Sequence, residues 1–442
     1  MRLLDRSAYP VVSLFSGAGI GDTGFRDAGL KPLVLSEIDP RRSALAELNF
    51  PEAQVAVGDL RQRYSEVVQL AKDQLQAIPR ARPFLLSATP PCQGMSKNGI
   101  GTILKAMRHG KRPRLDERNY LYKHVIRMVG DLTPDFLFFE NVDRMVNTYV
   151  LNGNKNQIRI IEHFQAQMEE AGYVGGFRVL DVADFGLPQH RRRTIGLFGR
   201  QEICGEALTT ADLFPQATHS GNRKNCLLPH VSVEDAIGTL PALDSKDRDH
   251  AVSSFHALHK VPVSRSDLYY WISHTAPGKS AYENNTCPNC QSMAEQRETR
   301  CPECGTLLPK PVVMDRGKDR LIRGYVSTYC RMIDSEPAHT VTTRSAYACS
   351  DRNLHPTQNR VLSLYEIALL QGMEPDRFVW GPVGAGNGRS KSRTRARAPD
   401  TLIRDVIGEA LPPLFSRTVG EHLLRLQRGE FRKRTDQDLR LF

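Results

Sequence analysis

The residues best suited to covalent chemistry are Cys92, in Pro90-Pro-Cys-Gln-Gly, and Glu140, in Phe138-Phe-Glu-Asn-Val. Two prolines stiffen the turn before Cys92, so its thiol is held at the end of a predicted strand, where it could act as a nucleophile. A cysteine is more often a small buried hydrophobic residue, but the neighbours of Cys92 argue against burial. Glu140 follows an apolar run, and desolvation would raise the pKa of its carboxyl toward neutrality, where it could act as an acid. An ion pair with a nearby arginine is the alternative for Glu140.

A basic motif, Gln189-His-Arg-Arg-Arg193, precedes another predicted strand. In an extended strand Arg191 and Arg193 point to the same side. Their guanidinium groups could hold a base carbonyl, a phosphate or Glu140 itself, because arginine offers paired donors to such acceptors. A solvated basic surface is the alternative.

A glycine-rich segment, Phe15-Ser-Gly-Ala-Gly-Ile-Gly-Asp-Thr-Gly24, follows the first predicted strand and opens a helix. Glycines let a backbone approach a ligand closely, and an acid at the end of the next strand, here Glu37, can accept hydrogen bonds from ribose hydroxyls. The pattern indicates a nucleoside cofactor, with NAD, S-adenosylmethionine (SAM) and a structural glycine turn all open at this point. Asp59 follows the third strand and could accept a hydrogen bond from an adenine amino group, or cap the next helix.

Four of the nine cysteines form two pairs, Cys287-Pro-Asn-Cys290 and Cys301-Pro-Glu-Cys304. Four thiolates at this spacing suit a tetrahedral zinc ion, and a closed four-thiolate site predicts a structural role. No secretion signal precedes them, so a disulfide framework is not expected.

Apolar runs alternate with helical spacing over the first two hundred residues, which predicts an α/β fold with a mostly parallel sheet covered on both faces. The predicted strands are 11–15, 33–38, 54–57, 84–88, 136–140, 177–182 and 194–198. The predicted helices are 40–49, 62–77, 120–132, 157–171 and 405–426. Ligands of such sheets bind at the carboxyl ends of the strands, where several of the residues above fall.

The predicted domain boundary lies where the alternation of predicted strands and helices ends. We expect a catalytic domain over residues 1–205 and a smaller, irregular domain over 206–380, with the zinc module at about 284–308. Residues 381–400 are rich in Gly, Ser and Arg and predict a flexible basic loop, and 401–442 predict a helix that returns to the first domain. The net charge of +11 suits a polyanionic partner. We expect no membrane span and a cytoplasmic location.

In their order along the chain, these motifs resemble the DNA (cytosine-5) methyltransferase family of bacteria and phages. Arg360-Val-Leu-Ser-Leu-Tyr-Glu366 with Leu370-Gln-Gly-Met373 resembles the penultimate motif of that family, and Ile407-Gly-Glu-Ala-Leu-Pro-Pro-Leu414 with Gly420-Glu-His-Leu423 resembles its last. The resemblance covers residues 11–200 and 358–424. The chain departs from the family at Glu409, where asparagine is common, and in its inserted four-cysteine module.

The resemblance implies a fold of the SAM-dependent methyltransferase type and methyl transfer from SAM to C5 of a cytosine flipped out of double-stranded DNA. Cys92 would attack C6, Glu140 would act at N3, and Arg191 and Arg193 would hold the base and the acid. A basic loop over residues 97–118, with seven Lys or Arg, would close over the DNA. We expect a monomer, accompanied by a cognate restriction endonuclease if it serves a restriction-modification system. The expected SAM contacts are Phe15, Ser16, Gly17, Gly19, Ile20, Gly21, Glu37, Ile38, Asp59, Leu60, Pro90, Glu409 and Ala410.

Three other functions are compatible with parts of the sequence. A transfer RNA methyltransferase with the same fold suits the charge equally well, although the long middle domain exceeds what a minimal catalytic chain needs. A catalytically inactive DNA-reading protein would be expected to lack Cys92, Glu140 or the arginine pair, all of which are present. An NAD oxidoreductase leaves the Pro-Pro-Cys-Gln-Gly and Glu-Asn-Val motifs unexplained.

Overall fold

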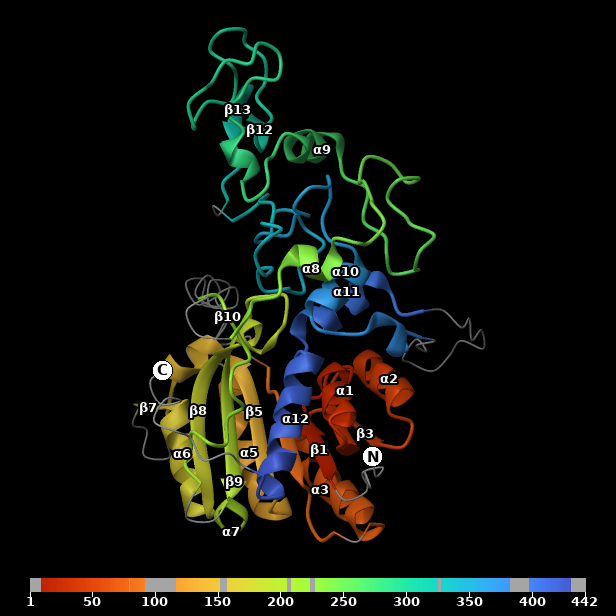
Figure 1. Cartoon of the computed structure of the whole chain (residues 1–442), viewed down its shortest axis with the longest axis vertical. Helices are drawn as coiled ribbons and strands as arrows, with labels where there is room; N and C mark the ends of the chain where they lie inside the picture. The colour runs from red at the N-terminus through yellow and green to blue at the C-terminus, as the bar shows by residue number, and fades with distance from the viewer. Residues whose placement is uncertain are drawn as a thin grey trace.

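The computed structural model describes residues 9–78, 80–91, 117–151, 157–204, 208–222, 227–324, 327–381 and 397–430. Its lower part is a seven-stranded sheet in the order β3-β2-β1-β4-β5-β9-β8 (Figure 1). The strands are β1 (Pro10–Leu14), β2 (Lys31–Glu37), β3 (Gln54–Val57), β4 (Leu85–Ala88), β5 (Phe136–Val142), β8 (Tyr173–Asp181) and β9 (Arg192–Arg200). All seven strands predicted from the sequence are present, with ends that differ by a few residues.

The sheet is mostly parallel, as predicted. Strands β1 to β5 pair in parallel, and β9 runs antiparallel between β5 and β8. Every residue of β1 and β4 is buried, which explains their continuous apolar runs, because helices cover both faces of the central strands. The order of the strands reverses between β1 and β4, so the carboxyl ends of these strands are the expected place for a ligand.

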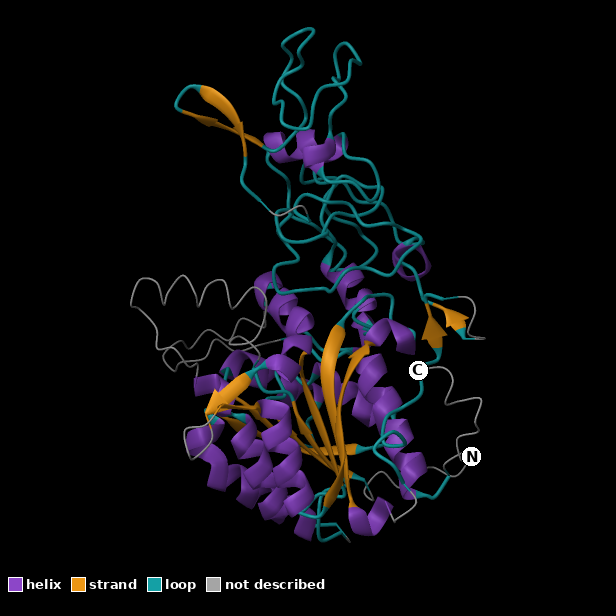
Figure 2. Cartoon of the chain, turned by 90° about the vertical axis from the view of Figure 1, so that its left-hand side faces the viewer, coloured by secondary structure: helices purple, strands orange, loops and turns teal. Residues whose placement is uncertain are grey.

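Two layers of helices enclose the sheet (Figure 2). Successive residues of a strand belong to two separate hydrophobic cores, one on each face of the sheet. Val12 and Leu86 pack with one set of helices, whereas Val11 and Leu85 pack with the other. The first set is α3 (Leu60–Gln76), α5 (Tyr122–Leu132) and α6 (Ile160–Glu170); the second is α1 (Ile20–Asp27), α7 (Gln201–Cys204) and α12 (Pro413–Gln427). Helix α2 (Pro40–Asn49) packs on β2 through Leu35 and Ala46.

Two helix predictions need correction. Residues 157–159 form a short strand, β7 (Gln157–Arg159), which pairs with β6 (Tyr149–Leu151), and the helix begins only at Ile160. The single helix predicted over 405–426 is two helices, α11 (Asp400–Glu409) and α12. Pro412 and Pro413 explain the break, because a proline lacks the N–H that would continue the ladder of α11 and suits the first turn of a new helix.

The last helix closes the fold by lying against the first. Ser416 Oγ donates a hydrogen bond to the Gly21 carbonyl at 2.7 Å. A Cβ on Gly24 would overlap the Pro413 carbonyl and the Ser416 hydroxyl, so only glycine permits this approach. The first and the last described helices, α1 and α12, therefore pack against each other beside the sheet.

The upper part of the molecule is irregular and is drawn mostly as loops in Figure 2. It contains α8 (Val233–Ile237), α9 (Ser266–Ser273), β10 (His219–Ser220), β11 (Leu228–Pro229), β12 (Val312–Asp315) and β13 (Lys318–Leu321). Helices α8, α10 (Leu364–Leu370) and α11 share a core that also includes Ala18, just before α1, and Ile20, its first residue. Short 3-10 helices occur at Glu117–Tyr120, Asp143–Asn147, Val182–Phe185, Ala281–Glu283 and Pro375–Arg377.

In this upper part, buried Arg and Lys side chains donate hydrogen bonds to backbone carbonyl groups that lie in loops or at the end of a helix. Arg331, 3% exposed, donates to the carbonyls of Ile272, Thr275 and His355. Lys310 Nζ donates to three carbonyls of the loop before it. Buried carbonyls need such donors because unpaired polar groups are costly away from water. No described helix combines the length and apolar character that crossing a bilayer requires.

Candidate active site

The sheet brings most of the sequence-predicted residues to one edge. Phe15 follows β1, Glu37 ends β2, Asp59 follows β3, and Pro90 follows β4. Glu140 lies near the end of β5, and Arg193 lies at the start of β9. Because β9 runs antiparallel to β5, its first residues meet the last residues of β5 at this edge. Cys92 and residues 97–116 of the basic loop lie outside the described residues.

Glu37 is held in a fixed orientation beside the glycine-rich turn. Its side chain is largely buried, and its two carboxylate oxygens accept hydrogen bonds from the Gly17 and Asp39 N–H groups, each at 2.9 Å. Ile38, directly after it, is 62% exposed. A buried carboxylate next to an exposed apolar side chain fits a nucleoside, whose ribose offers hydroxyl donors and whose base offers a flat apolar face.

The glycines of the turn divide into two kinds. Gly17 and Gly19 have φ angles of 58° and 76°, and Phe15 adopts 59°, an uncommon conformation for a residue other than glycine. A Cβ on Gly17 would meet nothing within 4 Å, so this glycine faces open space. In contrast, Cβ atoms on Gly21 and Gly24 would meet Leu411 and Pro413. The close approach permitted by the later glycines is therefore to the C-terminal segment of the chain.

Ser16 and Phe15 are also positioned by the neighbouring strands. Ser16 N donates to the Ser36 carbonyl at 3.0 Å, and Thr89 Oγ1 donates to the Phe15 carbonyl at 3.0 Å. The turn is thus fixed from β2 on one side and from β4 on the other. Together with Glu37 and Ile38, it fits the nucleoside part of SAM.

Asp59 caps helix α3, which was one of its two predicted roles. Its carboxylate accepts from the Arg61 N–H at 2.9 Å and pairs with the Arg61 guanidinium at 2.6 Å. The hydrogen bond from Arg61 is the main cause of a lowered pKa at Asp59. The carboxylate is therefore already hydrogen-bonded within the protein, and the buried Leu60 begins the helix beside it.

Glu140 and Arg193 form an ion pair at the edge of the sheet. Arg193 Nε lies 2.9 Å from Glu140 Oε1, and the two side chains are 14% and 11% exposed. The contact joins the Glu-Asn-Val motif to the Gln-x-Arg-x-Arg motif across the β5–β9 pair. The arginine thereby fixes where the carboxylate points.

Asn141 is a site residue that the sequence analysis did not single out. Its side chain is buried, and its Nδ2 donates to the Pro90 carbonyl at 3.1 Å. This bond ties the end of β5 to the proline turn that immediately precedes Cys92. Its position directly after Glu140 could have indicated a separate role for Asn141. Neighbouring strand residues face opposite sides of the sheet, so Asn141 cannot share the surroundings of the Glu140 side chain.

Arg191 takes a different place from Arg193. It lies just before β9, so the alternation expected within a strand does not apply to it. It is 2% exposed, and its guanidinium donates to the carbonyls of Val341, Gly408 and Ala410 at 3.0 to 3.1 Å. These described contacts join the residue before β9 to Val341, to the last turn of α11 and to Ala410 directly after it.

Gln189 and Gln371 strengthen the same junction. Gln189 Nε2 donates to the Leu370 carbonyl at 2.7 Å and its Oε1 accepts from the Val341 N–H. Gln371 Nε2 donates to the Ala410 carbonyl at 2.7 Å. Glu409 projects from this segment, and its Oε2 lies 2.6 Å from Nη1 of Arg42 on α2. Arg42 is a second residue that the sequence analysis missed.

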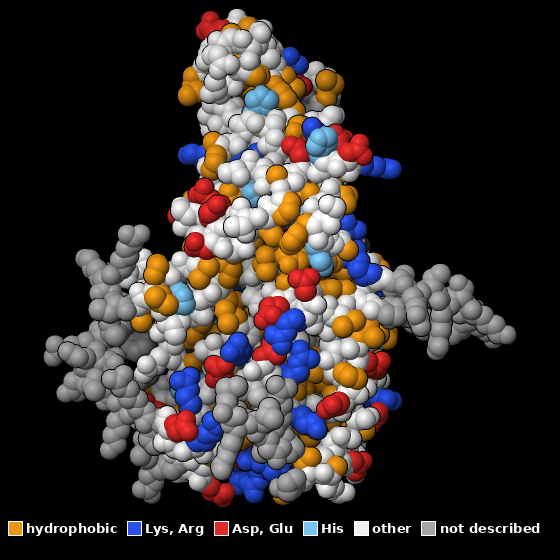
Figure 3. Space-filling model, turned by 45° about the vertical axis from the view of Figure 1, so that its right-hand side comes forward, with side chains coloured by type: hydrophobic (Ala, Val, Ile, Leu, Met, Phe, Trp, Pro, Cys, Tyr) orange, Lys and Arg blue, Asp and Glu red, His pale blue; other side chains and the backbone are white. Residues whose placement is uncertain are grey.

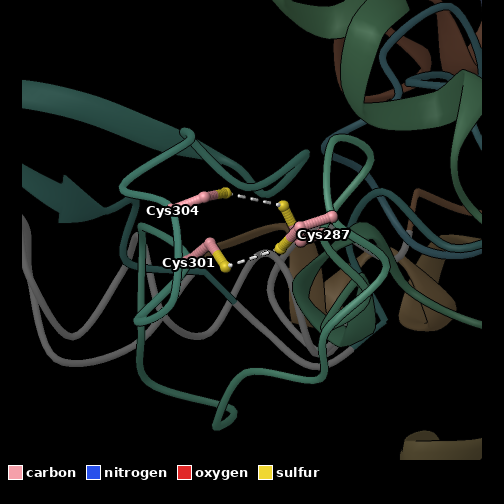
Figure 4. Close-up of side chains that lie close together, drawn as sticks. Cys287, Cys301 and Cys304 are labelled. Atoms are coloured by element: carbon pink, nitrogen blue, oxygen red, sulfur yellow. Dashed lines mark hydrogen bonds between the residues drawn. The ribbon is translucent and has the colours of Figure 1, made fainter.

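The four paired cysteines come together in the upper part of the molecule. Their sulfur atoms all lie within 4.8 Å of one another, with Cys287–Cys304 and Cys290–Cys301 distances of 3.5 Å. In Figure 4 the sulfurs of Cys287, Cys301 and Cys304 point toward a common centre. A tetrahedral zinc site with bonds of about 2.3 Å needs sulfurs about 3.8 Å apart. The cluster therefore fits a zinc ion.

The strand order and the nucleoside-fitting edge of the sheet define an α/β protein of the SAM-dependent methyltransferase class. A family model described as C-5 cytosine-specific DNA methylase matches residues 9–424. The chain therefore belongs to this family, and it is a DNA (cytosine-5) methyltransferase.

Similar proteins agree with this assignment. Type II methyltransferase M1.HgaI of Avibacterium volantium is 28% identical, over 91% of this chain and 95% of the relative. Type II methyltransferase M1.HphI of Haemophilus parahaemolyticus is also 28% identical, over 95% of this chain and 87% of the relative. Two solved structures share the fold: a prophage-encoded E. coli protein (TM-score 0.56, 17% identity, 95% of this chain and 99% of that one) and DNMT2 of Spodoptera frugiperda (0.52, 13%, 95% and 99%).

Proposed function

We propose that this enzyme methylates cytosine within a specific double-stranded DNA sequence, with Cys92 as the nucleophile and Glu140 as the group at N3. The observation that carries the proposal is the arrangement around Pro90. Asn141 holds the carbonyl of this residue, which stands two positions before Cys92, and the neighbouring Glu140 is held by Arg193. The same strand end therefore contacts Pro90, two positions before the proposed nucleophile in the sequence, and carries the carboxyl that would act with it.

The chemistry explains why both groups are needed. Cytosine C5 is a weak nucleophile, and addition of the Cys92 thiolate to C6, with a proton supplied at N3 by Glu140, makes C5 enamine-like. SAM, when bound, supplies the methyl group. Water, acting as the base, then takes the C5 proton, the bond from sulfur to C6 breaks, the proton at N3 returns to Glu140, and the thiolate is restored. Arg193 keeps the Glu140 carboxyl in place, and Arg191 acts as a positioning residue through the segment that it anchors.

The proposed SAM site lies along the carboxyl ends of β1, β2, β3 and β4. Glu37 would accept hydrogen bonds from the ribose hydroxyls, and Ile38 would contact the adenine ring. Gly17 would allow close approach of the backbone because nothing lies within 4 Å of its Cβ position. The remaining proposed contacts are Phe15, Ser16, Gly19, Ile20, Gly21, Asp59, Leu60, Pro90, Glu409 and Ala410.

The upper part of the molecule, within residues 206–380, is the proposed target-recognition domain. Zinc at the four cysteines would stabilise this domain, because few of its described residues lie in strands or helices. Four thiolates complete the coordination of zinc, so the role of the ion would be structural. The catalytic domain would comprise residues 1–205 together with the C-terminal segment 401–442.

The proposed DNA contacts draw on basic segments and on base flipping. Basic and acidic side chains are interspersed on the face shown in Figure 3, whereas residues 97–118 hold seven Lys or Arg against two acids. Such a segment beside the nucleophile suits the DNA backbone. Extruding the cytosine costs a few kcal/mol, which the phosphate contacts would offset.

The names of the Type II relatives support a place in a restriction-modification system with a cognate endonuclease, and we infer a monomer within the cell.

A covalent trapping experiment tests this proposal. Bisulfite sequencing of DNA from an expressing host first identifies the methylated sequence. A duplex with 5-fluorocytosine at that position is then incubated with SAM, because fluorine at C5 cannot leave as the proton does and the adduct persists. We expect the wild type and Cys349→Ser, a change at an exposed control thiol, to become trapped, and Cys92→Ser to stay free.

Trapping of Cys92→Ser would refute the nucleophile assignment. Glu140→Gln tests the second residue, and we expect it to lower the rate of adduct formation while DNA binding is kept. Transfer RNA serves as the competing substrate. Methylation of transfer RNA in preference to the DNA duplex would overturn the choice of substrate.

A further inference from the structure

Glu409 stands where several physical effects oppose a negative charge. It is the last residue of α11, and carboxylates are unfavourable at a helix C-terminus because the unpaired carbonyls there are negative. Although the side chain is 41% exposed, partial desolvation of its carboxyl raises its pKa, Arg42 opposes this rise, and the carboxylates of Asp405 and Glu37 add to it. A charged group that the fold itself disfavours is a candidate for binding a ligand.

The partner of Glu409 is also accessible. Arg42 Nη1 lies 2.6 Å from Glu409 Oε2, and the side chains are 25% and 41% exposed. Among the described residues, Arg42 Nε has no hydrogen-bond acceptor; the nearest carboxylate oxygen in an ion pair with it, Asp39 Oδ2, is 3.9 Å away. The Nε atom itself is buried, and Arg42 contacts Glu409 through Nη1 at the partly exposed end of its side chain.

The surroundings of this pair carry a surplus of negative charge. Four carboxylates, those of Glu37, Asp39, Asp405 and Glu409, belong to this cluster: Glu37 and Asp405 interact electrostatically with Glu409, and Asp39 and Asp405 interact with the guanidinium groups of Arg41 and Arg42. Arg41 is engaged with Asp39 at 2.7 Å. With every group ionised, the cluster has a net charge of −2 with Glu37 included, so the other three carboxylates exceed the two guanidinium groups by one negative charge beside Glu37, which the proposed function places at the ribose.

We propose that Glu409, held by Arg42, makes this site prefer SAM to the demethylated product S-adenosylhomocysteine (SAH). The inference rests on the proposed SAM site at Glu37. SAM carries a sulfonium, an ammonium and a carboxylate, for a net charge of +1. Transfer of the methyl group turns the sulfonium into a neutral thioether, and the net charge becomes zero. A fixed negative charge stabilises the substrate more than the product, so product release is favoured after each turnover.

Calorimetric binding of three ligands to the full-length protein tests this inference without relying on catalysis. The ligands are SAM, SAH and sinefungin, a SAM analogue with a cationic amine in place of the methylsulfonium. Glu409→Gln keeps the shape of the side chain and removes its charge. We expect the variant to bind SAM and sinefungin roughly three- to tenfold more weakly relative to SAH, the contribution of one charge at a solvent-accessible site.

A matched control separates a local effect from a change in net charge. Glu421→Gln removes one negative charge from α12, where Glu421 pairs with Arg417, and we expect the ratio of SAM to SAH affinity to stay at the wild-type value. Equal weakening of all three ligands in Glu409→Gln would overturn the inference, as would an unchanged ratio. Thermal unfolding of both variants verifies that they are folded.

Failure of the underlying SAM site gives a different result. If Glu37 does not bind the ribose, Glu37→Ala leaves the affinity for SAH, which has no net charge, unchanged, whatever Glu409→Gln does. A pH series adds an independent check. Lowering the pH through the raised pKa of Glu409 neutralises its charge, so the preference for SAM falls in the wild type. An identical pH dependence in Glu409→Gln would overturn the role of Glu409.

Discussion

Replacing Arg191 by methionine should destabilise the protein and weaken SAM binding together. Helix α11 ends at Glu409, and the Gly408 carbonyl would normally accept from the N–H four residues later. That residue is Pro412, which has no N–H. Arg191 supplies the missing donors, with both of its terminal nitrogens 3.1 Å from the Gly408 oxygen. The side chain therefore completes the end of a helix that the sequence leaves without its own donor.

The expected loss of unfolding free energy depends on how many backbone carbonyls accept hydrogen bonds from Arg191. Arg191 donates to three carbonyls, those of Val341, Gly408 and Ala410. A hydrogen bond that involves a charged group contributes about 1.5–3 kcal/mol, but Ala410 keeps its bond from Gln371. Allowing for relaxation, we expect Arg191→Met to lower the free energy of unfolding by ~3–4 kcal/mol. Arg191→Lys should restore part of it, because an ammonium cannot reach all three acceptors at once.

Urea unfolding and SAM calorimetry measure both consequences. Arg192→Met is the matched control, since it changes the adjacent, exposed arginine in the same way. We expect Arg192→Met to unfold within about 0.5 kcal/mol of the wild type, as is usual for surface substitutions. A loss in Arg191→Met no larger than that in Arg192→Met would refute the reasoning. So would full recovery of stability and SAM affinity in Arg191→Lys.

Three further predictions follow from other parts of the structure. Cys287→Ser should lose bound zinc and unfold at a lower temperature, while Cys349→Ser keeps both; a full metal load in Cys287→Ser would contradict the four-thiolate site. The hydrogen bond with Asp181 raises the pKa of His190 above 6.5, so its stabilising effect is complete below about pH 6.5 and is lost as the pH rises through the raised value. Asp181→Asn should return the NMR-measured pKa of His190 to or below 6.5, and an unshifted wild-type value would be the contrary result. DNA affinity should fall steeply with salt concentration, and a flat profile would speak against phosphate contacts.

The strands could be predicted because their signals are local. An uninterrupted apolar run such as that of β4 (Leu85–Ala88) is typical of a strand covered on both faces. The predicted ends of two helices were wrong where a helical apolar pattern ran on across a strand or a proline. Residues 157–159 have helical spacing yet pair as β7 with β6, and Pro412 divides a region whose apolar pattern continues on both sides.

The individual roles of site residues depended on contacts that no local pattern encodes. Arg191 and Arg193 are two positions apart, but one donates to carbonyls of the C-terminal segment and the other pairs with Glu140. Asp59 had two plausible roles, and the structure shows the helix cap. Arg42 belongs to none of the sequence motifs. Only the structure shows its ion pair with Glu409, which lies 367 positions later in the chain.

The sequence by itself determined the class of fold, the motifs of a DNA (cytosine-5) methyltransferase and the four cysteines that could hold zinc, because each depends on residue type and short spacing. Only the tertiary structure decided which arginine meets Glu140 and that Asn141 fastens the proline turn. It also decided that Gly24 makes room for the C-terminal helix. The physical reason is that hydrogen bonds and close packing depend on distances between elements far apart in the chain, and folding alone sets those distances.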